Sequence, residues 1–150
     1  MGNTPPDKIR FYYQYQSFVF KDRQRLKSFL IGLFRSEGLK LNSLNYIFCS
    51  DAFLLKLNQQ HLNHDTFTDI ITFELSDPEA PIEAEIYISV ERVKENAETF
   101  LTSFRNELHR VIFHGALHLC GYKDKSKADQ QLMRRRETYY LNKYFVSRET

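Results

Sequence analysis

Hydrophobic and polar residues alternate along the chain over residues 9–20, where Phe11, Tyr13 and Tyr15 fall on one side of the pattern. A period of two is typical of a strand, and we expect this one at the edge of a sheet. Three further strands are predicted over residues 44–49, 69–75 and 85–90. The last two are divided by the turn-forming Asp77-Pro78 pair and Pro81.

Elsewhere the hydrophobic residues recur every three or four positions, which predicts helices. The first carries the apolar stripe Leu26, Phe29, Leu30, Leu33 and Phe34. Asp22 can cap its start, and it ends before Gly38. The second begins at Ser50 or Asp51 and fades near Leu62, ahead of turn-forming residues 63–66.

The last part of the chain is predicted to be helical over about residues 91–100, 104–120 and 127–144. Ser126 with Asp129 can cap the final helix. Its predicted inward face consists of Leu132, Met133, Tyr140, Leu141 and Tyr144. The order β-α-β-α-β-β-α-α-α indicates an α/β (α+β) fold, with a mixed sheet of about four strands flanked by helices. We expect residues 1–150 to form a single domain, with residues 1–8 disordered.

Composition and charge narrow the function classes only a little. The chain has no signal sequence at its start and no apolar run of roughly 18 residues, so we expect a cytoplasmic protein without a membrane partner. Cys49 and Cys120 are too few for a disulfide framework and are expected as free thiols. The net charge is +2, but basic residues gather near the histidines of residues 114–118. Such a cluster either attracts an anionic substrate or forms a solvated helix face.

The segment HGALHLCGYKD, residues 114–124, contains the candidate chemistry. His114 and His118 are four residues apart on a predicted helix, so their rings project from one face and can bind one Zn²⁺ ion. Gly121 can turn the chain back in a left-handed conformation and bring Asp124 to the same point. Three protein ligands leave one position for a water whose pKa is lowered, and that metal-bound water is the expected catalyst. No side chain is assigned as a base.

A pair of histidines at this spacing also arises without any metal. The glycine and the aspartate that follow make a metal site more specific, because spacings of 4, 7 and 10 residues match the ligand frame of the metzincin proteases. Those proteases carry a glutamate as general base directly after the first histidine. This chain has Gly115 there, which cannot accept a proton.

The segment closely resembles HGxLHLxGYDH followed by MxxxE, the signature of the YbeY family of endoribonucleases. Met133 and Glu137 stand at the positions of the second part. HDTFTDIITF at residues 64–73, AEIYIS at 84–89 and RNEL at 105–108 resemble further family segments in the same order. The resemblance spans roughly residues 44 to 145.

This resemblance implies a zincin-like domain with one zinc ion per chain, bound at His114, His118 and Asp124. It also implies cleavage of single-stranded RNA in ribosomal RNA maturation and ribosome quality control, in association with the small ribosomal subunit, with no DNA substrate. The chain departs from the family pattern at Asp124, where a third histidine is usual, and at Lys123, where an aspartate is usual. Leu62 stands where the family commonly has an arginine.

Other candidate residues have less specific signals. We expect four residues to face the substrate: Thr68, Asp69, Arg105 and Lys123. Asp69 can alternatively serve only to end a loop. Glu137 either orients a metal ligand or forms a surface ion pair with Arg134. His61, His64 and His109 are expected on the surface, and Glu107 is expected too far from His114 to share its metal.

Three functions remain open at this level. The first is a metal-dependent endoribonuclease acting on ribosomal RNA. The second is a zinc metallopeptidase or another small hydrolase, which Gly115 disfavours. The third is a ribosome-binding assembly factor with a structural zinc, which Leu62 favours.

Overall fold

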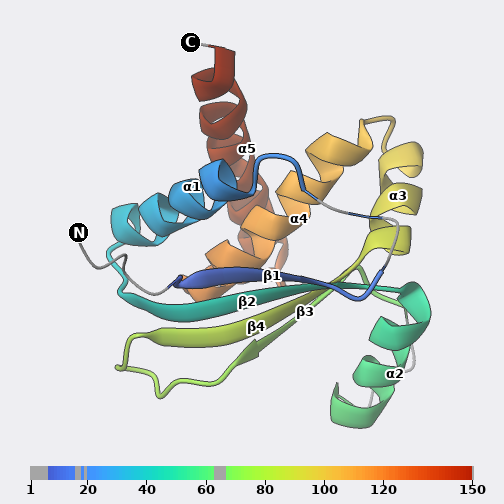
Figure 1. Cartoon of the computed structure of the whole chain (residues 1–150), viewed down its shortest axis with the longest axis horizontal. Helices are drawn as coiled ribbons and strands as arrows, with labels where there is room; N and C mark the ends of the chain where they lie inside the picture. The colour runs from blue at the N-terminus through green and yellow to red at the C-terminus, as the bar shows by residue number, and fades with distance from the viewer. Residues whose placement is uncertain (1–6, 16–17, 19, 63–66, 150) are drawn as a thin grey trace, which may run out of the picture.

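Four strands form one mixed sheet in the computed structural model, which describes residues 7–15, 18, 20–62 and 67–149 (Figure 1). The strands are β1 (Ile9–Tyr13), β2 (Leu41–Cys49), β3 (Ile70–Glu74) and β4 (Ile82–Ser89). Their order across the sheet is β1-β2-β4-β3. β1 and β4 are parallel to β2, whereas β3 pairs with β4 in the antiparallel sense. The predicted mixed sheet of four strands is confirmed, and so is the edge position of the first strand.

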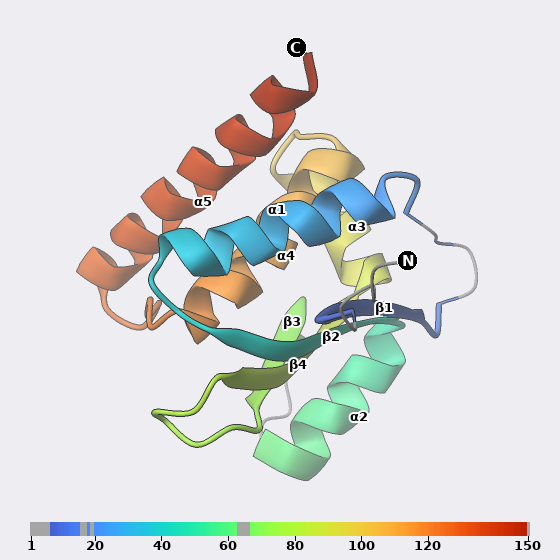
Figure 2. The ribbon, with the colours of Figure 1, turned by 60° about the vertical axis from the view of Figure 1, so that its left-hand side comes forward.

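Five helices accompany the sheet: α1 (Arg23–Ser36), α2 (Asp51–Leu62), α3 (Val90–Thr99), α4 (Phe104–Leu119) and α5 (Lys127–Glu149). α1, α4 and α5 lie on one face of the sheet, and α2 lies on the other (Figures 1 and 2). Ser89 and Ser103 cap α3 and α4, because their side-chain oxygens accept hydrogen bonds from the backbone N–H groups of Arg92 and Asn106. The predicted order of elements is confirmed.

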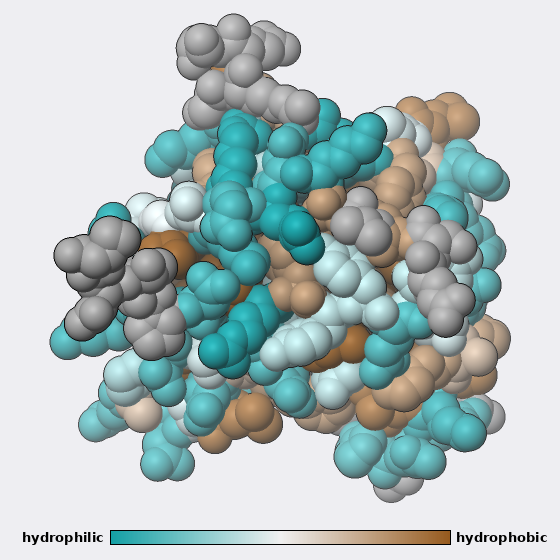
Figure 3. Space-filling view, in the orientation of Figure 1, coloured by the Kyte–Doolittle hydropathy of each residue, from teal (hydrophilic) through white to brown (hydrophobic). Residues whose placement is uncertain are grey.

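α4 forms the centre of the larger core. Its side chains meet those of the sheet, α1 and α5 in one continuous cluster that includes Leu30, Ile86, Ile112 and Tyr144. A smaller cluster around Leu54 fills the space between α2 and the opposite face of the sheet. Hydrophilic side chains cover much of the face seen in Figure 3, and hydrophobic ones appear between them in separate patches. The apolar residues that predicted the elements are therefore mostly inside.

Several predictions about the first strand and its surroundings were wrong. β1 ends at Tyr13 instead of reaching residue 20. Phe18 and Phe20 belong to no strand, and the ring of each lies 5.2 Å from that of Phe48. The side chain of Asp22 does not cap α1 and instead pairs with Arg105, 3.6 Å away. Aromatic packing and the ion pair replace the local interactions that the alternating pattern suggested.

The last helix is longer than predicted, and one residue of its predicted inward face is exposed. α5 continues to Glu149, and its Leu132 is 39% exposed although it was expected to face inward. The hydroxyl of Ser126 accepts the N–H of Asp129, as the predicted cap requires. Both cysteines are free, as expected.

The structure describes the start of the chain only in part and does not describe one predicted turn. Residues 1–6 and the predicted turn at 63–66 lie outside the described residues. Asp7 pairs with Lys27, and the carbonyl of Lys8 accepts the N–H of Leu44. Among the described helices, none is long and apolar enough to cross a membrane.

Candidate metal centre

His114 and His118 lie one turn apart near the end of α4, and each has one ring nitrogen already engaged. Nδ1 of His114 is 2.7 Å from a carboxylate oxygen of Glu137. Nδ1 of His118 is 3.2 Å from the carbonyl oxygen of Tyr122. A carbonyl oxygen can only accept, so His118 donates from Nδ1, and its Nε2 then has a free lone pair. The same assignment for His114 leaves Nε2 as the nitrogen directed toward Asp124.

The turn after α4 places Asp124 beside His114. Gly121 has a φ of +102°, the left-handed conformation that its position after the helix predicted. The chain then doubles back, and a carboxylate oxygen of Asp124 lies 3.4 Å from Nε2 of His114. The hydroxyl of Tyr122 donates to Glu37 at 2.8 Å, which ties this turn to the end of α1. The return of the aspartate thus depends on a contact with α1 as well as on the glycine.

A buried charge network supports His114 from behind. Glu137 is 2% exposed and accepts hydrogen bonds from His114 and, at 3.1 Å, from Arg110. Arg110 also donates to Glu107, which is itself 2% exposed. A carboxylate oxygen of Asp69 also lies 3.9 Å from Nη2 of Arg110. Three carboxylates therefore surround one arginine, and this excess of negative charge favours a cation next to His114.

The ionisation of the network follows from these contacts. Burial raises the pKa of Glu137, but the hydrogen bond from His114 and the charge of Arg110 outweigh burial, so this pKa is below its ordinary value. Burial also raises the pKa of Asp69, and Arg110 and His114 offset only part of that effect. Glu137 is thus the carboxylate held in its charged form, suited to accept the Nδ1 proton of His114.

The donor set fits a zinc ion in its chemistry. It offers two neutral imidazole nitrogens, each with its other nitrogen hydrogen-bonded, together with one carboxylate. Within the described ranges, however, no three histidine, cysteine, aspartate or glutamate side chains already form a group able to hold a metal. His114 and Asp124 are close to each other, and His118 completes the set only when the three side chains converge on an ion.

Not all of the residues expected to face the substrate lie near His114 and His118. Lys123 is exposed in the turn, next to Asp124. Asp69 is directed to Arg110 in the network, and the hydroxyl of Thr68 donates to the carbonyl of Ile70. Arg105 lies roughly 13 Å from His114 along the helix axis, where it pairs with Asp22.

His109 was expected on the surface and is instead 4% exposed. Its ring stacks on that of Tyr144 at 5.1 Å, and Nδ1 donates to the carbonyl of Arg105 at 2.7 Å. The expectation failed because α5 covers a second face of α4, which the single apolar stripe of α4 did not predict. Glu107 is buried and Arg110 half-buried for the same reason, and their role behind His114 was missed. Their only sequence signal was the spacing of three and four residues that links Glu107, Arg110 and His114.

Known proteins are similar to this chain over most of its length. The family model described as Endoribonuclease YbeY matches residues 14–145. The chain belongs to the YbeY family. A curated YbeY endoribonuclease from Flavobacterium psychrophilum is 46% identical over 138 residues, which cover 92% of this chain and 97% of the relative. Another, from Cytophaga hutchinsonii, is 41% identical over 136 residues, covering 91% and 95%.

The fold agrees with a solved structure as well. The solution structure of TM1509 from Thermotoga maritima matches with a TM-score of 0.64 and 29% identity, covering 94% of this chain and 91% of that one. The predicted membership of the YbeY family is confirmed, whereas the identity of the metal and the roles of single residues remain predictions.

Proposed function

We propose that this protein is a zinc-dependent endoribonuclease that cleaves single-stranded RNA in the maturation of ribosomal RNA. The observation that carries the proposal is the pair of histidines whose Nδ1 atoms are held by Glu137 and by the Tyr122 carbonyl, in a chain of the YbeY family. His114, His118 and Asp124 are the proposed ligands. Association with the small ribosomal subunit and a cytoplasmic location are parts of the same proposal.

The proposed roles of the metal ion, Glu137 and Arg110 follow from their chemistry. A bound zinc ion would polarise a phosphate oxygen and lower the pKa of a water molecule, so that no side-chain base is needed. Glu137 keeps the Nδ1 proton on His114 and thereby keeps Nε2 available. Arg110 keeps Glu137 charged.

Substrate contacts are proposed for the exposed cations near the turn. Lys123 lies beside Asp124 and can contact the phosphate next to the scissile bond. Lys127, Arg134 and Arg135 line a shallow depression on the first turns of α5. Phosphate contacts of this kind hold RNA without reading its sequence.

The peptidase alternative is disfavoured by the environment of Gly115. A Cβ atom at this position would lie 2.9 Å from the Cδ1 atoms of both Ile70 and Ile86, because α4 packs closely on the sheet there. A glutamate in place of Gly115 would enter the core instead of reaching a substrate beside the histidines. The general base that a metzincin places after its first histidine would therefore have to displace the side chains of Ile70 and Ile86.

The test compares zinc-loaded wild type with two single variants on single-stranded RNA, duplex RNA and casein. His118→Ala removes a proposed ligand. His61→Ala is the matched control, because His61 is an exposed histidine on α2, with its ring 5.8 Å from that of Phe73. We expect wild type and His61→Ala to cut single-stranded RNA and His118→Ala to be inactive.

The other outcomes point to the alternatives. Casein hydrolysis that His118→Ala abolishes would establish a peptidase. An assembly factor remains the second candidate, because Leu62 stands where family members commonly have an arginine. Zinc-dependent binding to small ribosomal subunits without cleavage of any RNA would favour that function.

A further inference from the structure

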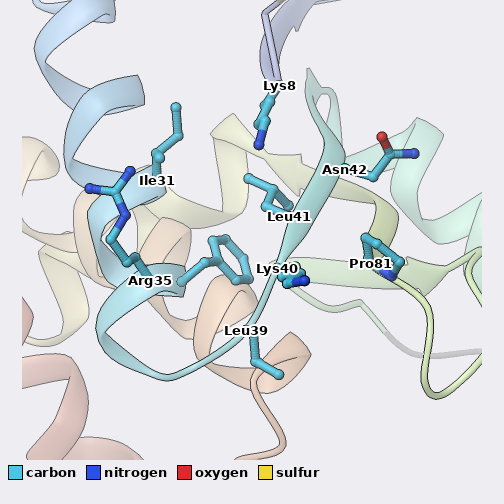
Figure 4. Close-up of a pocket in the computed structure, with 9 residues that line it drawn as sticks. Lys8, Ile31, Arg35, Leu39, Lys40, Leu41, Asn42 and Pro81 are labelled. Carbon is cyan, nitrogen blue, oxygen red and sulfur yellow. The ribbon is translucent and has the colours of Figure 1, made fainter.

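A groove lies between the end of α1 and the starts of β1, β2 and β4, and we call it the α1–β2 groove. Its volume is about 400 Å³, and the residues that matter for its chemistry are Lys8, Phe34, Arg35, Leu39, Lys40 and Leu41. In Figure 4, Lys8 extends toward Leu41, whereas Arg35 lies at the margin formed by α1 and Lys40 at the margin formed by β2. The floor is apolar and the margins carry the charge.

The charges of the groove are all of one sign. Lys8, Arg35 and Lys40 are exposed, and no carboxylate lines the groove among the residues that the structure describes. Among the described residues, no ion pair involves any of these three side chains. Several other cations differ in this respect, since arginines 92, 105, 110, 134 and 136 each pair with a carboxylate. Three cations without a carboxylate around a concave surface favour an anionic ligand.

The groove and the candidate metal centre are connected through the end of α1. Glu37 follows Arg35 by two residues and accepts hydrogen bonds from Tyr122 in the metal-site turn and from Arg136 of α5, both at 2.8 Å. Figure 2 shows the end of α1 and the turn between α4 and α5 on the same side of the molecule. The pairing with Arg136 neutralises Glu37, so the carboxylate between the two places repels an anion less.

We propose that the α1–β2 groove binds the phosphate backbone of the RNA strand where that strand continues beyond the metal centre. This inference rests on the proposed function, and it adds a second substrate site. The cations would contact successive phosphates, while the half-buried Leu39 offers an apolar contact to the sugars and bases. Cations on both margins of one groove suit the successive phosphates of a strand better than a single anion.

The experiment compares RNA binding by a variant that lacks two positive charges of the groove with binding by a variant that lacks two positive charges elsewhere on the surface. Arg35→Gln/Lys40→Gln is the groove variant, and Lys56→Gln/Lys94→Gln is the control, because its two lysines are exposed on α2 and α3. Both are made in the His118→Ala background so that the RNA stays intact. The affinity for labelled single-stranded RNA of 3 and of 12 nucleotides is measured over a range of salt concentrations.

The expected result is specific to the long RNA. Each lost phosphate contact makes the negative slope of log affinity against log salt shallower by about 0.7. The slope of the groove variant should therefore be shallower by about 1.4, and adding Lys8→Gln should make it shallower by about 0.7 more. The control should keep the slope of its background, and the 3-nucleotide RNA should not distinguish the variants. Circular dichroism checks that every variant is folded.

Two results would overturn the inference in different ways. Equal slopes for the groove variant and the control would show that RNA does not bind there, while RNA cleavage by wild type would leave the proposed function intact. Binding of polyglutamate that only the groove variant loses, with RNA binding unchanged, would assign the groove to an acidic protein segment. Failure of wild type both to cut and to bind RNA would instead refute the proposed function.

Discussion

Acid should destabilise this protein through His109, which lies on α4 five residues before the proposed ligand His114 and is not itself a proposed ligand. His109 is 4% exposed, packed against Tyr144 and Phe20. Burial, with a smaller contribution from the charge of Arg25, lowers its pKa from 6.5 to about 4. As the pH falls, His109 is therefore protonated near pH 6.5 in the unfolded chain but only near pH 4 in the folded chain.

The sign and size of the effect follow from linkage. Between these two pKa values the unfolded state binds more protons, so stability falls as the pH falls. At pH 5 the loss from this one group is about 2 kcal/mol relative to pH 7, and by pH 4 it approaches about 3 kcal/mol. Such a loss is a large part of the stability of a typical domain.

The assay is urea unfolding of metal-free protein at pH 7, 6 and 5, with wild type and His109→Phe in parallel. Phenylalanine retains an aromatic ring among Phe20, Phe113 and Tyr144 and does not titrate. Other groups titrate in both proteins, so only the difference between them reports on His109. We expect wild type to lose about 2 kcal/mol more than the variant between pH 7 and 5. Identical pH dependence would refute the reasoning and would mean that the pKa of His109 is the same in the folded and the unfolded protein.

Three further predictions concern the metal centre and its surroundings. Glu137→Gln should weaken zinc binding about 10-fold to 100-fold by loss of the charged acceptor, as measured by competition with a chelator, and unchanged affinity would exclude a supporting role. Asp124→Ala should weaken zinc binding strongly while Asp124→His retains it; equal affinity of wild type and the alanine variant would mean that the third ligand lies elsewhere. Gly115→Glu should lower the free energy of unfolding by about 3 kcal/mol or more, because the carboxylate would enter the contact with Ile70 and Ile86; a stable variant in urea titration would contradict the packing argument.

Much of the fold could be predicted from local patterns. Alternation and helical periodicity identified every described element in the right order, because each element has to bury one face of its own. The spacing of His114 and His118 and the glycine at position 121 likewise predicted a shared helix face and a left-handed turn. These features depend on residues within a few positions of one another, and so the chain itself specifies them.

Tertiary packing decided the remainder. α5 covers a second side of α4, which turns His109 from an expected surface residue into a buried one and places Glu137 against His114. A pattern along one helix cannot tell which distant helix will pack against its other faces, so Glu107 and Arg110 were not predicted behind His114, although Glu137 was named as a residue that could orient a metal ligand. The same holds for Lys8 and Arg35, which lie far apart in the sequence and line one groove only because β1 and α1 meet there. Sequence spacing determined the proposed ligand frame, whereas the contacts between elements distant in the chain determined its support and its surrounding charge.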